Sequence, residues 1–106
     1  MSETFDRVRG LVELGDWRAS DHALQRVAEH AIIASDLVDG IAGAVVVEDY
    51  PDYHAGPCVL VLQSDRDGPV HALWGLEKGT DRPVVLITAY RPDRERWQDD
   101  NRTRRP

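Results

Sequence analysis

The sequence predicts an α+β domain in which three short helices precede a four-stranded antiparallel sheet. In residues 1–43, apolar side chains recur every three or four positions, which is the period of a helix with one buried face. In residues 44–91, runs rich in β-branched residues are separated by short segments with glycine or proline, which is typical of strands joined by turns. A charged segment, residues 92–106, follows the expected sheet.

Each expected helix has a recognisable boundary. The first extends from near Ser2 to near Gly15. Ser20 is a good N-cap for the second helix, and Ser35 is expected to cap a short third helix that Gly43 ends. The apolar face expected for the second helix consists of Leu24, Val27, Ala28 and Ala31.

The expected strands cover residues 44–49, 58–63, 70–76 and 84–91. Their connections are short, so neighbouring strands should be antiparallel and form a meander. If the last hairpin, with its turn at residues 77–82, is symmetric about Gly79 and Thr80, His71 lies opposite Thr88 and Tyr90 lies nearby on the same face. Residues 92–97 can add one helical turn.

Size and composition indicate a single folded domain over residues 1–106. Hydrophobic residues make up 42% of the chain and charged residues 30%, which argues against a disordered or a membrane protein. No apolar run approaches the roughly 20 residues that span a bilayer. Cys58 is the single cysteine, so no intrachain disulfide can form, and we expect a cytoplasmic protein.

Charge is distributed unevenly along the chain. The net charge is −6, whereas residues 91–106 hold six arginines against four acidic residues, a local charge of +2. Nucleic-acid binding depends on neutralising phosphates, so an acidic domain must concentrate its basic groups to bind RNA. Arginine suits bidentate recognition of phosphate, although an arginine-rich composition can also reflect the genome.

The second helix carries a group of polar side chains on one face. His22, Arg26 and Glu29 are spaced at i, i+4 and i+7 and could serve as a proton carrier, a phosphate clamp and an orienting group. The same pattern is also typical of a solvent-exposed helix face. His71, on an expected strand, could transfer protons together with Tyr90, or could be a core histidine with one hydrogen bond.

Metal and cofactor signals are weak. The four histidines and Cys58 lack the paired spacing of a zinc motif, and no glycine-rich phosphate loop occurs, so we expect no cofactor or metal. Cys58 lies in an apolar strand, where a buried thiol is expected. Trp97 could stack on a base, or could dock its arginine-rich segment onto the sheet.

Several short motifs resemble a bacterial family known only as a domain of unknown function. Ser20 to Arg26 fits Ser-x-His-Ala-x-x-Arg on a helix, and Pro69-Val70-His71 fits a Pro-x-His that begins a strand. The other matching pieces are Glu29 to Ile32, where His30 replaces an arginine, Asp49-Tyr50-Pro51, and Ile87 to Asp93 with Trp97. The resemblance extends from about residue 18 to 105.

The resemblance implies a function as well as a fold. That family looks like the RelE/MqsR-type toxin fold, a group of small ribonucleases that are often encoded beside an antitoxin. It implies metal-independent RNA cleavage by attack of the ribose 2′-OH. His71 or His22 would then be the general base or acid, Arg26 the phosphate stabiliser, and Tyr90 an orienting or proton-donating group.

Two functional hypotheses follow. The first is a toxin-like endoribonuclease or RNA-binding protein with an antitoxin partner. The alternative is a non-catalytic module that binds a protein or forms a homodimer, because an acidic body and a basic end can pair between subunits.

Overall fold

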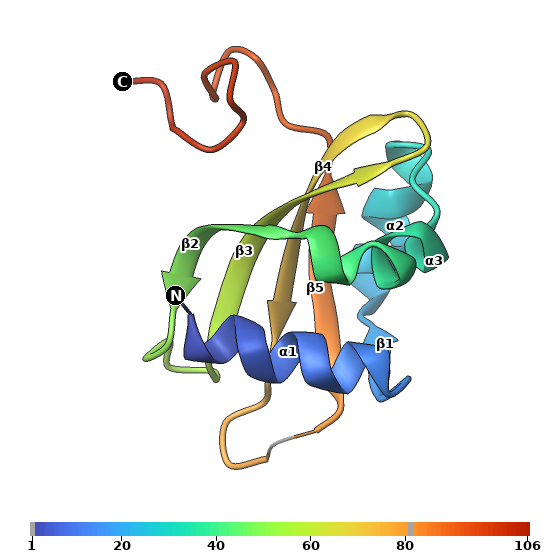
Figure 1. The fold of residues 1–106 in the computed structure, drawn as a ribbon, viewed down its shortest axis with the longest axis vertical. Coiled ribbons are helices and arrows are strands. Elements are labelled where there is room, and N and C mark those ends of the chain that lie inside the picture. The colour runs from blue at the N-terminus through green and yellow to red at the C-terminus, as the bar shows by residue number, and fades with distance from the viewer. Residues whose placement is uncertain (1, 81) are drawn as a thin grey trace.

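Helices cover one face of a five-stranded sheet in the computed structural model, which describes residues 2–80 and 82–106 (Figure 1). The α+β class and the three helices are confirmed. In chain order the elements are α1 (Glu3–Glu13), β1 (Trp17–Ala19), α2 (Asp21–Glu29), α3 (Ala34–Asp39), the 3-10 helix η1 (Ile41–Gly43), β2 (Val45–Tyr50), β3 (Cys58–Asp65), β4 (Gly68–Gly75) and β5 (Val84–Tyr90). Residue 81, within the turn expected at 77–82, lies outside the described residues.

Serine side chains set the starts of the first two helices, as expected. The Ser2 and Ser20 hydroxyls each accept a hydrogen bond from a backbone N–H three residues later, at 3.0 Å. The expectation for the third helix is wrong, because α3 already begins at Ala34 and Ser35 lies inside it. The N–H of Ile32 bonds to the Val27 carbonyl at 2.8 Å and fixes the chain one residue before the N-cap.

The sheet is mixed, so the expected four-stranded antiparallel meander is only part of it. The strand order is β1-β5-β4-β3-β2, and β1 pairs with β5 in parallel. Three residues are too few to show the alternation of a strand, and the partner of β1 lies more than sixty residues away in the sequence. Local sequence patterns therefore predicted the meander of β2 to β5 and missed β1, the fifth strand of the sheet.

The register of the β4–β5 hairpin also differs from the symmetric expectation. His71 lies opposite Tyr90, and Leu73 takes the position opposite Thr88. The ladder shifts between Leu73 and Trp74, where the bulge leaves Ile87 without a partner. This pairing places the His71 and Tyr90 side chains directly beside each other on one face.

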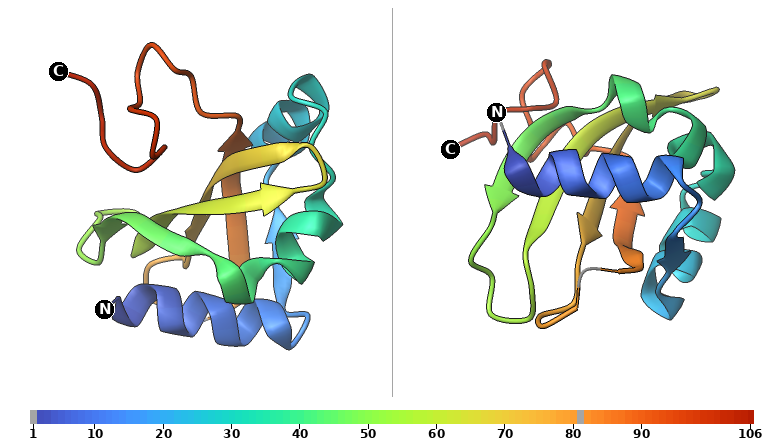
Figure 2. Two further views of the ribbon diagram at one scale, coloured as in Figure 1. Left: turned by 45° about the horizontal axis from the view of Figure 1, so that its top comes forward. Right: turned by 60° about the horizontal axis from the view of Figure 1, so that its bottom comes forward.

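One face of the sheet forms the main core. Figure 2 shows α1 lying across this face, where Val8 and Val12 join one buried cluster with side chains of β3, β4 and β5. The buried Trp74 donates to the Gln63 side chain at 3.0 Å, and Gln63 in turn donates to the Leu37 carbonyl at 2.8 Å. These bonds connect the sheet to α3 within the core.

Helix α2 packs differently from the expectation. Ala23 and Val27 are its buried residues, whereas Leu24 is 53% exposed and Ala28 and Ala31 are exposed as well. The contacts of α2 are mainly with β5, which has a free edge beyond the short β1. The apolar face is narrower than expected because the helix lies beside this edge, where Ala23 and Val27 join the main core.

The opposite face of the sheet is partly covered by the C-terminal segment, residues 92–106. In the left-hand view of Figure 2 the strands lie between this segment and α1. Its first turn closes with hydrogen bonds from the Arg96 and Trp97 N–H groups to the Asp93 carbonyl, both 2.9 Å, as expected. Trp97 is only 2% exposed and packs against His71, so the tryptophan docks the segment onto the sheet.

Candidate functional site

A pocket of about 450 Å³ opens where α2, the end of β5 and the C-terminal segment meet. We call it the arginine pocket, because its lining includes four arginines and only one acidic residue. Its lining residues are Arg26, His30, Tyr90, Arg91, Asp93, Arg96, Trp97 and Arg104. In a chain with a net charge of −6, such a local excess of cations marks a candidate site for an anion.

The edge of β5 positions α2 beside the pocket. The Ser20 N–H and hydroxyl donate to the carbonyls of Leu86 and Ile87, both at 3.0 Å. At the other end of the helix, Nδ1 of His30 accepts the N–H of Arg91 at 3.2 Å. Held at both ends, α2 places the Arg26 guanidinium 5.9 Å from the centre of the Tyr90 ring.

His30 is a neutral donor in this arrangement. Since Nδ1 accepts a hydrogen bond, the ring proton of the neutral imidazole is on Nε2. Partial burial and the nearby Arg26 lower the pKa of His30, despite an opposing effect of Glu29. At neutral pH the pocket therefore gains an N–H donor from His30 rather than a further positive charge.

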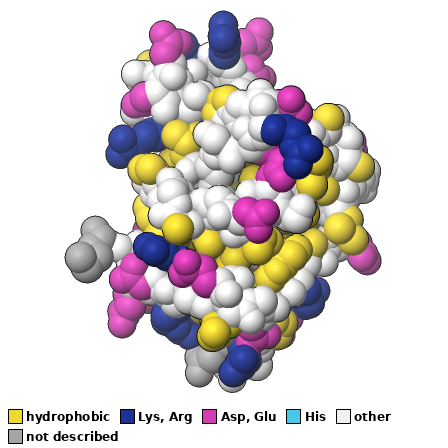
Figure 3. All heavy atoms as spheres, turned by 45° about the vertical axis from the view of Figure 1, so that its right-hand side comes forward, with side chains coloured by type: hydrophobic (Ala, Val, Ile, Leu, Met, Phe, Trp, Pro, Cys, Tyr) yellow, Lys and Arg dark blue, Asp and Glu magenta, His cyan; other side chains and the backbone are white. Residues whose placement is uncertain are grey.

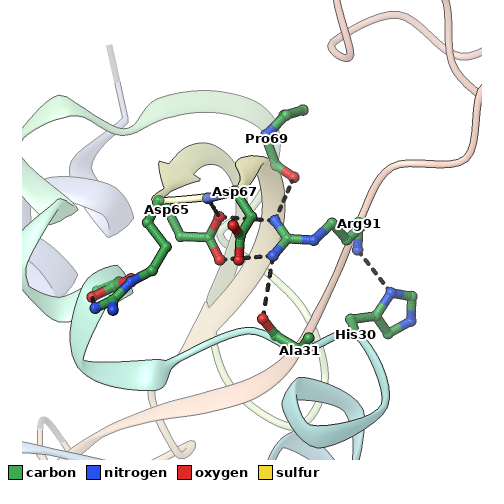
Figure 4. Close-up of polar contacts among 8 residues, drawn as sticks. His30, Ala31, Asp65, Asp67, Pro69 and Arg91 are labelled. Atoms are coloured by element: carbon green, nitrogen blue, oxygen red, sulfur yellow. Dashed lines mark hydrogen bonds and ion pairs between the residues drawn. The ribbon is translucent and has the colours of Figure 1, made fainter.

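Two of the four pocket arginines are neutralised by carboxylates. Arg91 forms bonds of 2.8 and 2.9 Å with Asp65, whose side chain is 1% exposed, and its guanidinium also reaches two backbone carbonyls (Figure 4). Arg104 forms two bonds of 2.8 Å with Glu48 and lies over the Trp97 ring. Both guanidiniums therefore serve mainly to hold the structure together.

The remaining two arginines are the ones available to a ligand. Arg26 has a 3.5 Å contact with the half-exposed Glu29, which is a weak surface pair. The Arg96 side chain is exposed and has no hydrogen-bond or ion-pair partner within residues 2–80 and 82–106. Burial raises the pKa of Tyr90, and this effect is opposed first by Arg104 and then, more weakly, by Arg26 and Arg96.

Behind the pocket wall, His71 is fully buried and held by hydrogen bonds on both ring nitrogens. Nε2 lies 2.6 Å from the Asn101 carbonyl oxygen, which can only accept, so Nε2 carries the proton. Nδ1 then accepts from the Tyr90 hydroxyl, 3.3 Å away. Burial lowers the pKa of His71 in spite of the Asn101 carbonyl, which favours the charged form.

The local backbone explains how Asn101 reaches His71. Asn101 has a φ of 57°, a left-handed conformation that asparagine tolerates better than most residues. Its neighbours form a small hairpin in which the Gln98 N–H donates to the Thr103 carbonyl and the Arg105 N–H to the Arg96 carbonyl, both at 2.8 Å. The C-terminal segment therefore supplies both a wall of the pocket and a partner for the buried histidine.

Three of the four residues selected from the sequence lie together. His71 contacts Tyr90, and Arg26 lies over the Tyr90 ring. His22 is exposed, one helical turn before Arg26, and does not line the arginine pocket. Arg26, His71 and Tyr90 therefore form one contiguous group, and His22 lies outside it.

Two pocket residues, His30 and Arg96, are not among the site residues predicted from the sequence. The spacing of four residues between Arg26 and His30, which places both on one helix face, is the signal that could have indicated His30. Arg96 lies in a charged segment whose path could not be anticipated. Within the described residues, no group of three or more His, Cys, Asp or Glu side chains could hold a metal ion.

Cys58 is a buried thiol on the same sheet face as His71. Burial raises the pKa of this thiol, and the carboxylate of Asp49 adds to the effect. A thiol with a raised pKa is a poor nucleophile at neutral pH.

None of the helices in the described chain combines the length and apolarity required to cross a bilayer.

Taken together, the fold and the site define a small α+β domain with a cationic pocket at one end of a mixed sheet. Residues 19–91 match the family model described as a domain of unknown function (DUF4258), and the chain belongs to this family. The matched region contains Arg26, His30, His71 and Tyr90 and stops before the C-terminal segment. No curated protein and no solved structure matches the chain.

Proposed function

We propose that this domain binds RNA in the arginine pocket and cleaves it without a metal ion, as a toxin-like endoribonuclease. One observation carries the proposal: the Tyr90 hydroxyl connects a pocket with two available arginines to a buried, neutral histidine. Cationic side chains beside a hydroxyl and a neutral imidazole are the groups required to hold a phosphodiester and accept a proton.

Substrate binding would use the groups that have weak partners or none. A phosphate between Arg26 and Arg96 would receive charge-assisted hydrogen bonds from both guanidiniums. The Nε2–H of His30 would donate a further hydrogen bond to a phosphate oxygen. Arg91 and Arg104 would keep their carboxylate partners and maintain the shape of the pocket.

The cleavage step would be a transesterification at phosphorus. The ribose 2′-oxygen attacks the adjacent phosphorus, and the bond from phosphorus to the 5′-oxygen breaks. The 2′-OH gives its proton to the Tyr90 oxygen while Tyr90 passes its own proton to Nδ1 of His71, and solvent water protonates the 5′-oxygen. Arg26 and Arg96 stabilise the negative charge that builds up on the phosphate oxygens. The products are a 2′,3′-cyclic phosphate and a 5′-hydroxyl.

The overall acidity of the chain limits how much RNA it would contact. Figure 3 shows acidic and basic side chains interspersed over one face of the molecule, without a large patch of a single sign. Two available arginines imply a short contact with one or two phosphates. Affinity for single-stranded RNA should therefore fall with salt with a slope of only about −1.4 on logarithmic axes.

Cleavage of a single-stranded RNA in the presence of EDTA tests the proposal. We expect a 2′,3′-cyclic phosphate product from the wild-type protein, and strongly reduced cleavage by Tyr90→Phe, His71→Ala and Arg26→Ala. Arg9→Ala is the matched control, because Arg9 is an exposed arginine of α1 whose side chain pairs with the exposed Glu13. Equal cleavage by all variants, or none by the wild type, would overturn the catalytic assignment.

His22 has a separate place in this test. It is exposed and lies outside the pocket lining, so it could reach only RNA that extends along α2 from Arg26. His22→Ala should then affect long substrates and leave cleavage of a dinucleotide unchanged. A large loss with the dinucleotide would instead give His22 a direct role in proton transfer.

A non-catalytic role in binding a protein, such as an antitoxin or a second copy, is the second candidate. The supporting observation is that large apolar side chains on or beside the helices are exposed, with Leu14 at 77% and Leu24 at 53%. The basic end of the chain supports it less, because Arg104 pairs with Glu48 of the same chain. Light scattering after size-exclusion chromatography tests self-association, and a strict monomer would remove the homodimer.

A further inference from the structure

A second, smaller hollow lies on the sheet face that carries His71. It has a volume of about 200 Å³ and an almost entirely apolar surface, and we call it the aromatic hollow. Its lining residues are Tyr50, Tyr53, Cys58, Leu73 and Ile87. Tyr50 and Tyr53 are 40% and 50% exposed, so their rings remain accessible to a ligand.

Hydrogen-bonded side chains connect the aromatic hollow with the arginine pocket. Arg104 lines the arginine pocket and bonds to Glu48, and Glu48 accepts the Tyr50 hydroxyl at 2.6 Å. Along β4, Leu73 follows His71 by two residues on the same face, a separation of about 7 Å. Two connections therefore link the sites: the Arg104–Glu48–Tyr50 series, and the face of β4 on which His71 contacts Tyr90 of the pocket and Leu73 lines the hollow.

Local contacts keep the hollow open and its walls in place. A Cβ atom on Gly75 would lie 2.7 Å from the Cδ1 of Ile87, so the absence of a side chain there lets Ile87 settle against the sheet. The bond to Glu48 fixes the direction of the Tyr50 ring. Tyr53 packs against His54 with ring centres 4.5 Å apart, which limits its orientations.

We propose that the aromatic hollow binds a nucleobase, namely the base of the nucleotide next to the phosphate in the arginine pocket. The inference rests on the proposed function, because it takes RNA as the ligand of the adjacent pocket. The hollow is smaller than the roughly 300–1,000 Å³ of most small-molecule sites, which suits one planar ring system. Stacking on tyrosine tolerates every base, so this subsite adds affinity with little sequence preference.

Binding of short RNA to the full chain tests the subsite. Base-aromatic stacking contributes about 1–3 kcal/mol, so Tyr53→Ala should weaken binding by about tenfold, within a range of roughly 5- to 150-fold. Tyr53→Phe keeps the ring and should bind like the wild type. An RNA of the same length that lacks its bases should bind the wild type and Tyr53→Ala equally. Equal affinity of Tyr53→Ala and the wild type for normal RNA would overturn the proposal.

A second measurement separates this inference from the catalytic one. Adenosine, which has no phosphate, should shift the methyl resonances of Leu73 and Ile87 in NMR spectra of the wild type, and less so in Tyr53→Ala. These shifts without any RNA cleavage would support the subsite while the proposed activity fails. Cleavage that depends on Tyr90, with no shift from adenosine and no effect of Tyr53→Ala, would overturn the subsite alone.

Discussion

The hydroxyl oxygen of Tyr90 lies 3.3 Å from Nδ1 of His71, within a hydrogen-bonded series that continues from Nε2 to the Asn101 carbonyl. The three residues come from β5, β4 and the C-terminal segment. The Trp97 ring packs against the imidazole in a T-shaped arrangement, with ring centres 4.4 Å apart. A buried histidine can thereby influence a pocket that it does not reach itself.

Tyr90→Phe removes the proposed proton path while keeping the ring. We expect the fold to be retained and RNA cleavage to fall by about 10²–10⁴-fold, the usual contribution of a positioned acid or base. Initial cleavage rates at saturating RNA would measure the loss, and the affinity should change little. A variant with wild-type rates would exclude the hydroxyl from the reaction.

The pH dependence of cleavage should reflect a neutral His71 and a protonated Tyr90. Burial lowers the pKa of His71, so the neutral acceptor form persists below pH 6.5 and activity is lost only as pH falls further. Burial raises the pKa of Tyr90, so an alkaline loss should begin above pH 10. A rate profile measured from pH 4 to 11 checks both limits, and an acidic limb centred above pH 7 would contradict the role of His71.

Arg26→Ala should weaken RNA binding and make it less sensitive to salt. Removing one phosphate contact reduces the slope of log affinity against log salt by about 0.7 for a single strand. Fluorescence anisotropy of a labelled RNA at several salt concentrations would measure the slope. Arg9→Ala removes the same charge from an exposed site on α1 and should leave the slope unchanged. Equal slopes in both variants would indicate that Arg26 does not contact phosphate.

Asp65→Asn should destabilise the fold and alter its response to acid. Hydrogen bonds from Arg91 hold the pKa of Asp65 below its usual value. Folding thus favours the ionised form of Asp65. The contribution of this carboxylate to the free energy of unfolding is therefore complete above the pKa that Asp65 has in the unfolded chain, and it is lost as the pH falls through the lower pKa of the folded chain. We expect a loss of about 2 kcal/mol at pH 7 and a smaller one at pH 3.

Urea unfolding at both pH values measures this difference. Asp36→Asn is a suitable control, because Asp36 makes the same bidentate contact with Arg66, whose side chain is 63% exposed. This exposed pair should matter less than Asp65–Arg91. A loss for Asp65→Asn that does not change between pH 3 and pH 7 would exclude the ion pair as its cause.

Trp97→Ala should release the C-terminal segment while the sheet stays folded. The indole is 2% exposed and supplies the main apolar contact of residues 92–106 with the sheet. Amide hydrogen exchange should accelerate at Gln98 and Arg105, whose N–H groups bond within the segment. Amides of the β3–β4 hairpin serve as the internal reference. Unchanged protection of Gln98 and Arg105 would show that the segment is held by other contacts.

The sequence by itself determined the elements whose signals are local. Helix starts at Ser2 and Ser20 and the strands β2 to β5 follow from capping and side-chain alternation. Arg26, His71 and Tyr90 could be selected because they are polar residues at regular positions within such elements.

Only the tertiary structure decided how these residues meet. The parallel pairing of β1 with β5 and the bulge at Ile87 depend on contacts between distant segments, and no short window of sequence contains them. Hydrogen bonds from Ser20 and to His30 hold α2 beside the free edge of β5. This position places Arg26 over Tyr90 and leaves His22 outside the pocket. Docking of Trp97 then brings Asn101 to His71, because burying the indole fixes the path of the charged segment.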